Sequence, residues 1–242
     1  MLDTLGTMLV GLSMAVILTA VLTTMPLRLS SRLVVAGSAG AWVGIAAAVV
    51  ASSGSLAQPA TVLVLFAAPL IATGLILLAS PTAQRAVGGI PLKLLEGLNI
   101  IRLGGVLFVL LAFAGRLSGP FPYVAGLGDF VTGALAVPLL WSATNKRPVR
   151  DRWVFAWNTF GMLDLIVAVA LGFISRDGSP VQLIHGGAGT AAMLTLPWAY
   201  VPAVLVPFFL IAHSIIFVRL RARRTRSVGR RSATIGELSH AH

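Results

Sequence analysis

Residues 123–143 read YVAGLGDFVTGALAVPLLWSA, residues 153–174 read WVFAWNTFGMLDLIVAVALGFI, and the basic segment TNKRPVRDR joins them. Each run is apolar and close to the roughly 20 residues that a helix needs to cross the hydrocarbon core of a bilayer. A connection this short predicts an antiparallel helical hairpin. Each helix carries one carboxylate well inside its apolar run, Asp129 in the first and Asp164 in the second.

The whole chain shares the apolar character of this hairpin. Of its 242 residues, 57% are hydrophobic and 10% are charged, whereas about a quarter of the residues in a soluble domain are charged. Apolar runs of spanning length fall at about 5–25, 33–51, 60–79, 95–117, 123–143, 153–174 and 200–219. We therefore predict an all-α membrane protein, a bundle of seven transmembrane helices over residues 1–220, followed by a basic, disordered cytoplasmic tail over residues 221–242.

Basic residues fall on alternate connections between these spans, and this asymmetry predicts the orientation. Cytoplasmic loops of membrane proteins carry an excess of Lys and Arg. The basic positions are Arg28, Arg32, Arg85, Lys93, Lys146, Arg147, Arg150, Arg152 and the arginines of residues 219–231. We expect the N-terminus outside and the C-terminus inside. The first run lacks a basic leading segment and a cleavage motif, so it is expected to stay as a span.

The net charge of +11 lies largely in these loops and the tail, which favours lipid over nucleic acid as the partner. Five arginines follow one another closely at the end of the last span: Arg219, Arg221, Arg223, Arg224 and Arg226. Each basic residue gains about 1 kcal/mol near an anionic leaflet. We expect these residues to bind anionic lipids and to anchor the inner end of the last helix.

Four ionisable residues lie inside separate spans: Arg102, Asp129, Asp164 and His213. Placing Asp or Arg at the centre of a membrane helix costs about 2.5 to 3.5 kcal/mol, so each residue needs a partner or a wet cavity. Depth along the helices places the two carboxylates within about one turn of each other. It groups Arg102, His213 and Asn158 in a second layer nearer the cytoplasm. If the carboxylates face each other, one of them is expected to hold a proton.

Two interpretations of these residues stay open. In the first they carry protons or bind an ion or substrate, with Glu96 and Asn99 as access from the cytoplasm and Arg116 as the exit. In the second they only fix the register of the helices through pairs, namely Arg102 with Asp164, Arg116 with Asp129, and His213 with Asn158. Buried ionisable groups in membranes often serve a function, but polar pairs between helices also serve assembly alone.

Small residues and prolines predict how the other spans pack. Small residues recur at every fourth position of the second span, at Ala36, Gly40, Gly44 and Ala48. This stripe predicts close packing of helices, and an internal contact is favoured over a homodimer. We expect Trp42, in the same span, to serve packing. In the last span, Pro202 and Pro207 free the carbonyls of Trp198 and Ala203 to bind water, a cation or a side chain.

Several chemistries lack the residues that they need. The chain has no cysteine, which excludes disulfides, thiolate metal sites and iron–sulfur clusters. Lys93 and Lys146 lie at span ends, so retinal has no lysine in mid-membrane, and hydrolase and nucleotide-binding motifs are missing. We predict no metal, no cofactor and no catalytic residue. Haem on His213 alone stays an alternative, because His185 lies in a loop and offers no second ligand at matching depth.

From Asn99 onward, four motifs stand out: Arg-x-x-Gly at 102–105, Gly-x-Gly-Asp at 126–129, Trp-Asn-x-x-Gly-x-x-Asp-Leu at 157–165, and a Pro-rich run ending in His at 202–213. In these motifs the last four spans resemble a family of uncharacterised bacterial multi-pass inner-membrane proteins. The resemblance implies a bacterial inner-membrane location but no activity. The Gly-x-Gly-Asp motif is also similar to half of the aspartyl intramembrane protease signature, but Leu163 stands where that family has Tyr.

The leading hypothesis is a polytopic inner-membrane protein that acts as a proton- or cation-coupled permease for a small solute, with the buried carboxylates as the coupling site. The first alternative is a non-catalytic membrane subunit or sensor, joined to another subunit or a second copy, whose buried charges are structural. The second is a haem or quinone redox protein. Only the leading hypothesis predicts pH-dependent flux of a solute.

Overall fold

The computed structural model describes residues 1–53, 58–145 and 151–239, with residues 53, 59 and 224–239 described by their backbone alone. Every regular element in this described part is a helix. Seven helical segments are long and apolar enough to cross a bilayer. The prediction of an all-α bundle of seven spans is thereby confirmed.

Five of the spans are single helices: α1 (Leu2–Thr24), α2 (Leu29–Ser53), α3 (Pro59–Ala79), α7 (Phe121–Thr144) and α8 (Asp151–Ile174). The fourth span is a composite of α5 (Leu92–Leu98), the 3₁₀ segment η1 (Asn99–Gly105) and α6 (Val106–Phe113). The last span begins with the π-helical turn η3 (Val201–Leu205) and continues into α9 (Val206–Ser239). Span ends agree with the predicted ones to within about four residues. The division at residue 220 and the disorder of the tail stay predictions.

One helix lies where the sequence predicted only a loop. The short helix α4 (Pro81–Gly89) follows α3 directly. The Ser80 hydroxyl caps it by accepting a hydrogen bond from the backbone N–H of Ala83 at 3.2 Å, and Pro81 occupies the first helical turn, where a missing N–H costs nothing. Arg85 lies on this helix, so the basic connection predicted there is helical in part.

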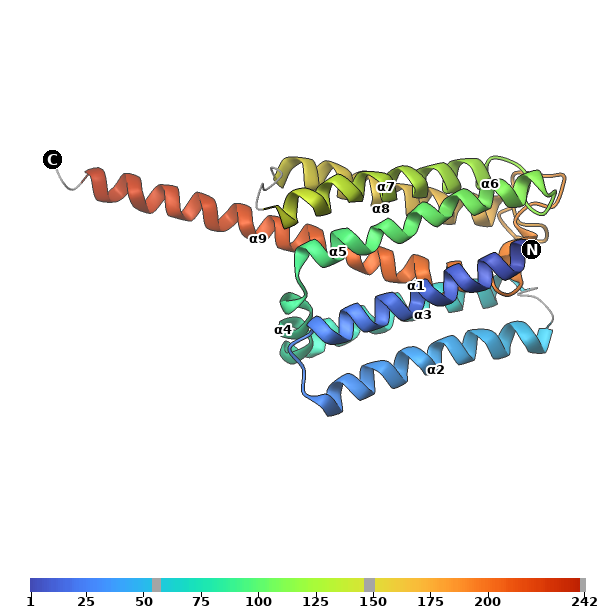
Figure 1. Cartoon of the computed structure of the whole chain (residues 1–242), viewed down its shortest axis with the longest axis horizontal. Coiled ribbons are helices and arrows are strands. Elements are labelled where there is room, and N and C mark those ends of the chain that lie inside the picture. Colours follow the sequence, from blue (N-terminus) through green and yellow to red (C-terminus); the bar gives the residue numbers. More distant parts are fainter. Residues whose placement is uncertain (54–57, 146–150, 240–242) are drawn as a thin grey trace.

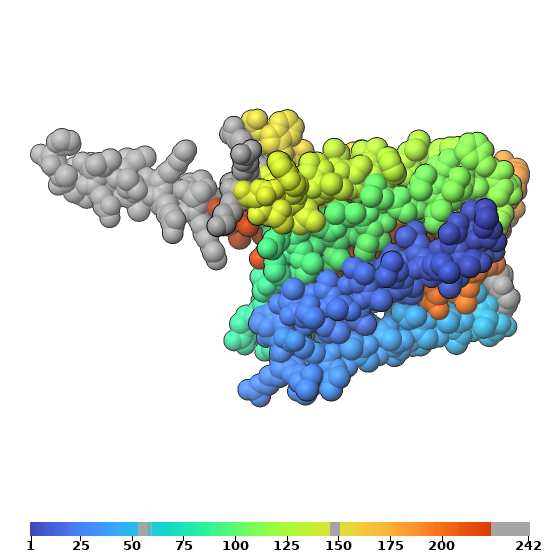
Figure 2. Space-filling view, viewed as in Figure 1, coloured from blue at the N-terminus to red at the C-terminus, as the bar shows by residue number. Residues whose placement is uncertain are grey.

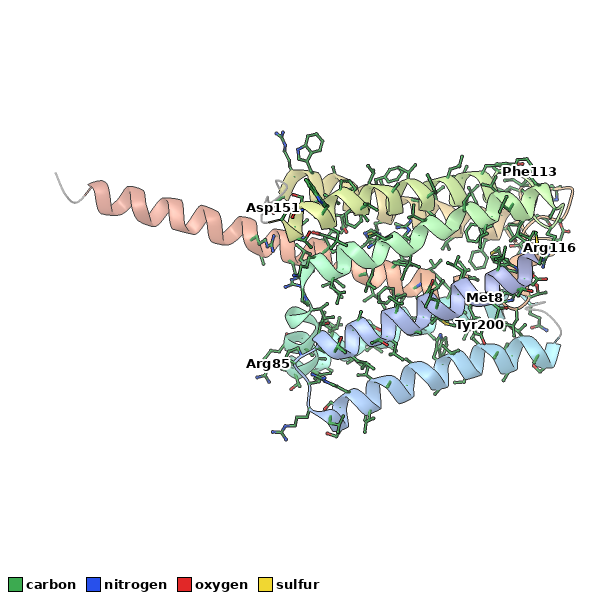
Figure 3. The ribbon with its side chains drawn as sticks, in the orientation of Figure 1. Met8, Arg85, Phe113, Arg116, Asp151 and Tyr200 are labelled. Atoms are coloured by element: carbon green, nitrogen blue, oxygen red, sulfur yellow. The ribbon has the colours of Figure 1, made fainter. Side chains whose placement is uncertain are left out.

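The spans run side by side along one direction, so the bundle has two distinct ends (Figure 1). The N-terminal end holds the start of α1 and the connection 175–200, and Phe113 and Arg116 lie there (Figure 3). The opposite end holds α4 and the extension of α9, and Arg85 and Asp151 lie there; we call it the basic end. Lys146, Arg147 and Arg150 lie outside the described residues. The predicted orientation in a membrane stays a prediction.

Helices α5 to α9 form the packed centre of the bundle, and α1, α2 and α3 lie on one side of it. In Figure 2, α1 covers the near face between α2 and the fourth span. At the basic end, one apolar cluster joins Leu95, Ala136, Val154 and Ile216 from four different helices. Most residues at the centre of this cluster are almost wholly buried, so this end of the bundle is densely packed.

The N-terminal end is closed by contacts between residues far apart in the sequence. Asp3 accepts hydrogen bonds from Arg116 at 2.6 Å and from the indole N–H of Trp198 at 2.8 Å. The Ser118 hydroxyl accepts a hydrogen bond from the backbone N–H of Gly189 at 2.7 Å. These bonds join the start of α1, the turn after α6 and the 175–200 connection into one cap.

Helix α2 lies at the edge of the bundle, and its small-residue stripe does not face inward. A Cβ built on Gly40 or Gly44 would meet no heavy atom within 4 Å, so the predicted internal helix contact is wrong. The side that does face inward is that of Trp42, whose indole N–H donates to the carbonyl of Ala203 at 2.9 Å. Because Pro207 has no N–H, this carbonyl lacks its usual helical donor. One of the two carbonyls that the prolines free is thus satisfied by Trp42.

Candidate functional site

Arg102 lies on the 3₁₀ segment η1 in the middle of the fourth span. The side-chain amide of Asn99 donates to the carbonyl of Leu95, four residues earlier, at 2.9 Å. The backbone N–H of Asn99 bonds instead to Glu96, three residues earlier. A side chain that takes the i−4 carbonyl in this way competes with the α-helical pattern, and the 3₁₀ winding of η1 begins at this residue.

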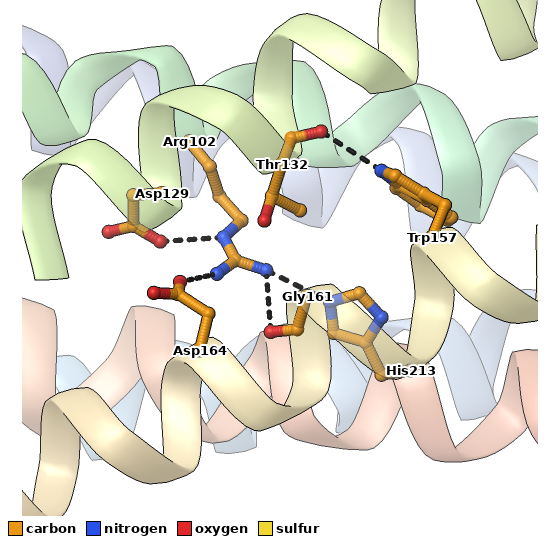
Figure 4. A network of polar contacts seen from close by, with 7 residues as sticks. All are labelled: Arg102, Asp129, Thr132, Trp157, Gly161, Asp164 and His213. Atoms are coloured by element: carbon orange, nitrogen blue, oxygen red, sulfur yellow. Dashed lines mark hydrogen bonds and ion pairs between the residues drawn. The ribbon is translucent and has the colours of Figure 1, made fainter. Parts of the chain in front are cut away.

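The guanidinium of Arg102 binds both carboxylates that the sequence singled out (Figure 4). Its Nε donates to Asp129 Oδ1 at 2.6 Å, and its Nη2 donates to Asp164 Oδ2 at 2.5 Å. Its Nη1 donates to the carbonyl of Gly161 at 3.1 Å. The residue is only 3% exposed, so these ion pairs are screened very little by solvent. The two predicted layers are therefore one network centred on Arg102.

His213 and Asn158 continue the network toward the basic end. Nη1 of Arg102 also lies 2.9 Å from Nε2 of His213, and Nδ1 of His213 lies 2.7 Å from Oδ1 of Asn158. A guanidinium only donates, so Nε2 must accept and Nδ1 must carry the proton. The amide of Asn158 in turn donates to the backbone carbonyl of His213 at 3.0 Å. These bonds fix His213 as a neutral ring with both nitrogens occupied.

Glycines bring the helices close enough for these contacts. A Cβ on Gly128 would overlap the carboxylate of Asp164, and a Cβ on Gly105 would overlap the Cβ of Asp129. The fifth span therefore approaches the fourth and sixth at positions where only glycine fits. This agrees with the clustering of glycines near Arg102 and Asp129 in the sequence.

The two carboxylates differ in what they face. The side chain of Asp129 is 16% exposed, against 6% for Asp164. Asp129 lines two apolar cavities, which leave about 80 Å³ and about 50 Å³ for the centres of water-sized molecules. The first lies between α3, α7, α8 and the start of the last span, and the second lies against α1 and η1. Both extend from Asp129 toward the N-terminal end, so Asp129 is the more accessible carboxylate.

The predicted path through Glu96, Asn99 and Arg116 does not form a continuous chain. Arg116 is held by Asp3 at the N-terminal cap rather than by Asp129. Glu96 is buried near the basic end, and Oδ1 of Asn99 has no hydrogen-bond partner among the described residues. The depth estimate agrees with the common contact of Asp129 and Asp164 to Arg102, but it did not give the direction in which Arg116 points.

The arginines of the last span make contacts within the chain. Arg219 donates a hydrogen bond to the carbonyl of Ile90, and Arg223 pairs with Asp151 at 3.5 Å. Arg221 is exposed. The side chains of Arg224 and Arg226 lie outside the described residues, so the binding of anionic lipid by this group stays a prediction.

The geometry also bears on cofactors. In the described part of the chain, no group of three or more His, Asp or Glu side chains is placed to hold a metal ion. His213 is fully buried and both of its ring nitrogens are hydrogen-bonded. A haem iron would have to displace Arg102 or Asn158 from it, which removes the support for single-histidine haem ligation.

Fold and site together define a multi-pass helical membrane protein with charged residues buried in its bundle. The chain belongs to the family described as Domain of unknown function (DUF8737), whose model matches residues 59–221. The match begins at α3 and ends with the last span, so it includes the whole Arg102 network, whereas α1 and α2 precede it. No curated protein and no solved structure matches the chain.

Proposed function

We propose that this protein is a proton- or cation-coupled permease for a small solute, in which Asp129 and Asp164 form the coupling site and Arg102 is their counter-charge. The observation that carries the proposal is that one buried guanidinium serves two carboxylates. With His213 neutral, two ionised carboxylates and one guanidinium give the site a net charge of about −1. A net charge inside a bilayer is costly, so the site favours uptake of one proton or one monovalent cation.

Access supports the same proposal. Asp129 lines both cavities that lead toward the N-terminal end, so an ion or a solute in either cavity reaches this carboxylate. Toward the basic end, His213 and Asn158 are fully buried and are followed by the packed cluster around Leu95 and Ile216. The coupling site thus has cavities on one side and a packed core on the other, and a site in one state of an alternating-access cycle is asymmetric in this way.

Proteoliposomes that contain the purified protein and an entrapped pH-sensitive dye test the proposal. With the membrane potential clamped, a pH gradient is expected to drive uptake of at least one member of a panel of small cationic, neutral and anionic solutes, and the dye is expected to report the coupled proton. Asp129→Asn is expected to abolish this coupling. Asp151→Asn, which removes an exposed carboxylate at the basic end, is the matched control and is expected to retain it.

A second measurement needs no solute. On acidification in detergent, the wild-type protein is expected to take up one more proton than the double variant Asp129→Asn/Asp164→Asn, because the variant lacks the excess carboxylate. Equal proton uptake by the two proteins, together with no pH-driven flux of any solute in the panel, would show that the proposal is wrong.

A structural role is the second candidate, and one observation favours it. All three nitrogens of the Arg102 guanidinium have partners inside the bundle, so the network also fixes the register of four helices. In that case Asp129→Asn lowers the thermal stability but changes neither proton uptake nor flux. The two measurements above separate the candidates directly.

A further inference from the structure

We infer that the larger cavity binds a hydrophobic organic cation, which takes the place of the proton at Asp129. This inference rests on the proposed function and names the class of solute that the same site would move. The exchange is an acid dissociation coupled to ion pairing: the O–H bond of the protonated Asp129 carboxyl breaks, the proton passes to water, and the cation pairs with the carboxylate without a covalent bond.

The side chains that line the larger cavity indicate that the ligand has an apolar body. Almost all of the lining side chains are apolar, and they come from α3, α7, α8 and the start of the last span. Asp129 is the acidic group among them. A carboxylate at the end of an apolar cavity repels anions and gives little to neutral polar molecules, whereas a cation with an apolar body matches both the charge and the walls.

Aromatic rings strengthen the preference for a cation. Four phenylalanines line the cavity: Phe66, Phe108, Phe121 and Phe173. Phe108 and Phe121 are stacked with their ring centroids 6.0 Å apart. Aromatic rings attract organic cations, and the attraction is largest where water is excluded. The combination of several aromatic rings with one carboxylate is a recognition pattern for ammonium-type ligands.

A positively charged residue at the end of the cavity away from Asp129 determines how a cationic ligand is oriented. Arg176, just beyond α8, lines that end together with Thr190. Along α8, the distance from Leu165, near Asp129, to Arg176 is roughly 16 Å at 1.5 Å per residue. Burial lowers the pKa of Arg176, but a guanidinium stays charged throughout the physiological range. The cationic centre therefore lies at Asp129, and the apolar body extends toward the N-terminal end.

Tetraphenylphosphonium is the probe for this inference, because it has an apolar body and a fixed charge that does not titrate. Equilibrium dialysis of the purified full-length protein is expected to show saturable binding that weakens as the pH falls, since protons compete for Asp129. Each bound cation is expected to release one proton at a pH where the site is protonated. Tetraphenylborate, an anion of the same shape, is expected not to bind.

Variants locate the site. Asp129→Asn is expected to weaken tetraphenylphosphonium binding at least tenfold and to remove its pH dependence, whereas Asp129→Glu keeps the charge and is expected to retain both. Phe121→Leu is expected to weaken binding by roughly threefold to thirtyfold through loss of the ring. Asp151→Asn is the matched control and is expected to bind as the wild type does. Gel filtration verifies that each variant is folded.

Each remaining outcome separates this inference from the proposed function. Equal binding of tetraphenylphosphonium and tetraphenylborate, or equal binding by the wild type and Asp129→Asn, overturns the cation site. If the probe does not bind while the wild type still takes up its extra proton, the substrate class is wrong and the permease proposal stands. If the extra proton and all pH-driven flux are also missing, both are wrong.

Discussion

The two halves of the bundle on either side of Arg102 differ in how tightly their side chains pack. Toward the basic end, His213 and Asn158 are hydrogen-bonded to each other and fully buried, and the apolar side chains beyond them leave a dense core. Toward the N-terminal end, large aromatic side chains surround cavities instead of filling them. Mean hydropathy would not distinguish these halves.

This asymmetry indicates which half is built to stay fixed and which to admit a ligand. A dense core tolerates neither added nor removed volume, whereas side chains around a cavity have space to adjust. Asp129 lies at the boundary, with one oxygen on Arg102 and its side chain partly exposed to the cavities. The predictions below test the boundary first and then each half.

The largest effect is expected at the boundary itself. Arg102→Met removes the only cation that contacts the two carboxylates among the described residues, and leaves both in an apolar interior. Loss of one partner of a buried ion pair costs about 3 to 5 kcal/mol. We expect a loss of stability of this size in thermal or denaturant unfolding of the detergent-solubilised protein. Adding Asp129→Asn and Asp164→Asn to the same chain is expected to restore a large part of it.

The matched control for Arg102 is Arg116→Met. Arg116 also pairs with an aspartate at 2.6 Å, but both side chains are substantially exposed at the N-terminal end. Exposed ion pairs contribute at most about 1 kcal/mol. A similar loss for both variants would mean that the buried position of Arg102 confers no special stability.

Alanine substitutions at two glycines of α8, Gly161 and Gly172, allow the two halves to be compared within one helix. A Cβ on Gly161 would lie 2.7 Å from Cε1 of His213, whereas a Cβ on Gly172, beside the cavity, would lie 3.7 Å from its nearest neighbour on Phe121. Overpacking costs about 1 to 3 kcal/mol, and alanine in a helix gains about 0.5 to 1 kcal/mol over glycine. Gly161→Ala is therefore expected to lower the unfolding temperature, and Gly172→Ala to keep or raise it. The same sign for both would contradict the proposed asymmetry.

The smallest effect concerns the looser half. Trp42→Phe removes the indole N–H that donates to the carbonyl of Ala203, where Pro207 has removed the usual donor. Hydrogen bonds between membrane helices contribute about 1 kcal/mol or less. We expect a loss of that size in unfolding experiments, with Trp141→Phe, on an exposed indole, as the control. No difference between the two variants would show that Trp42 acts by packing alone.

Length and hydropathy were sufficient for the spans, because crossing a bilayer fixes the number of apolar residues in each helix. Depth arithmetic was sufficient to bring Asp129 and Asp164 to the same level. It was insufficient for Arg116, whose partner is Asp3 on α1. Membrane helices are apolar on all sides, so the sequence gives the depth of a residue but not the direction in which it faces.

Two local features, the outward-facing glycine stripe of α2 and the 3₁₀ winding of η1, also could not be predicted from the sequence. The exposed stripe of Gly40 and Gly44 has the same pattern whether it faces a neighbouring helix or the outside. The 3₁₀ winding of η1 begins at Asn99, whose side chain bonds to Leu95, and no periodicity of the sequence marks it. The glycines near Arg102 in the sequence indicate close packing of helices, but they do not indicate the 3₁₀ winding.

The winding of η1 has a mechanical consequence. A 3₁₀ helix rises about 2.0 Å per residue and an α-helix about 1.5 Å, so rewinding Asn99–Gly105 would shorten the fourth span by roughly 3.5 Å. The twist per residue also differs, by about 20°, which would turn Arg102 by roughly 60° relative to α6. These seven residues lie between α5 and α6, so rewinding them would both shift and rotate one of these helices relative to the other. A shift and rotation of this size would move the guanidinium relative to both carboxylates if α7 and α8 stayed in place.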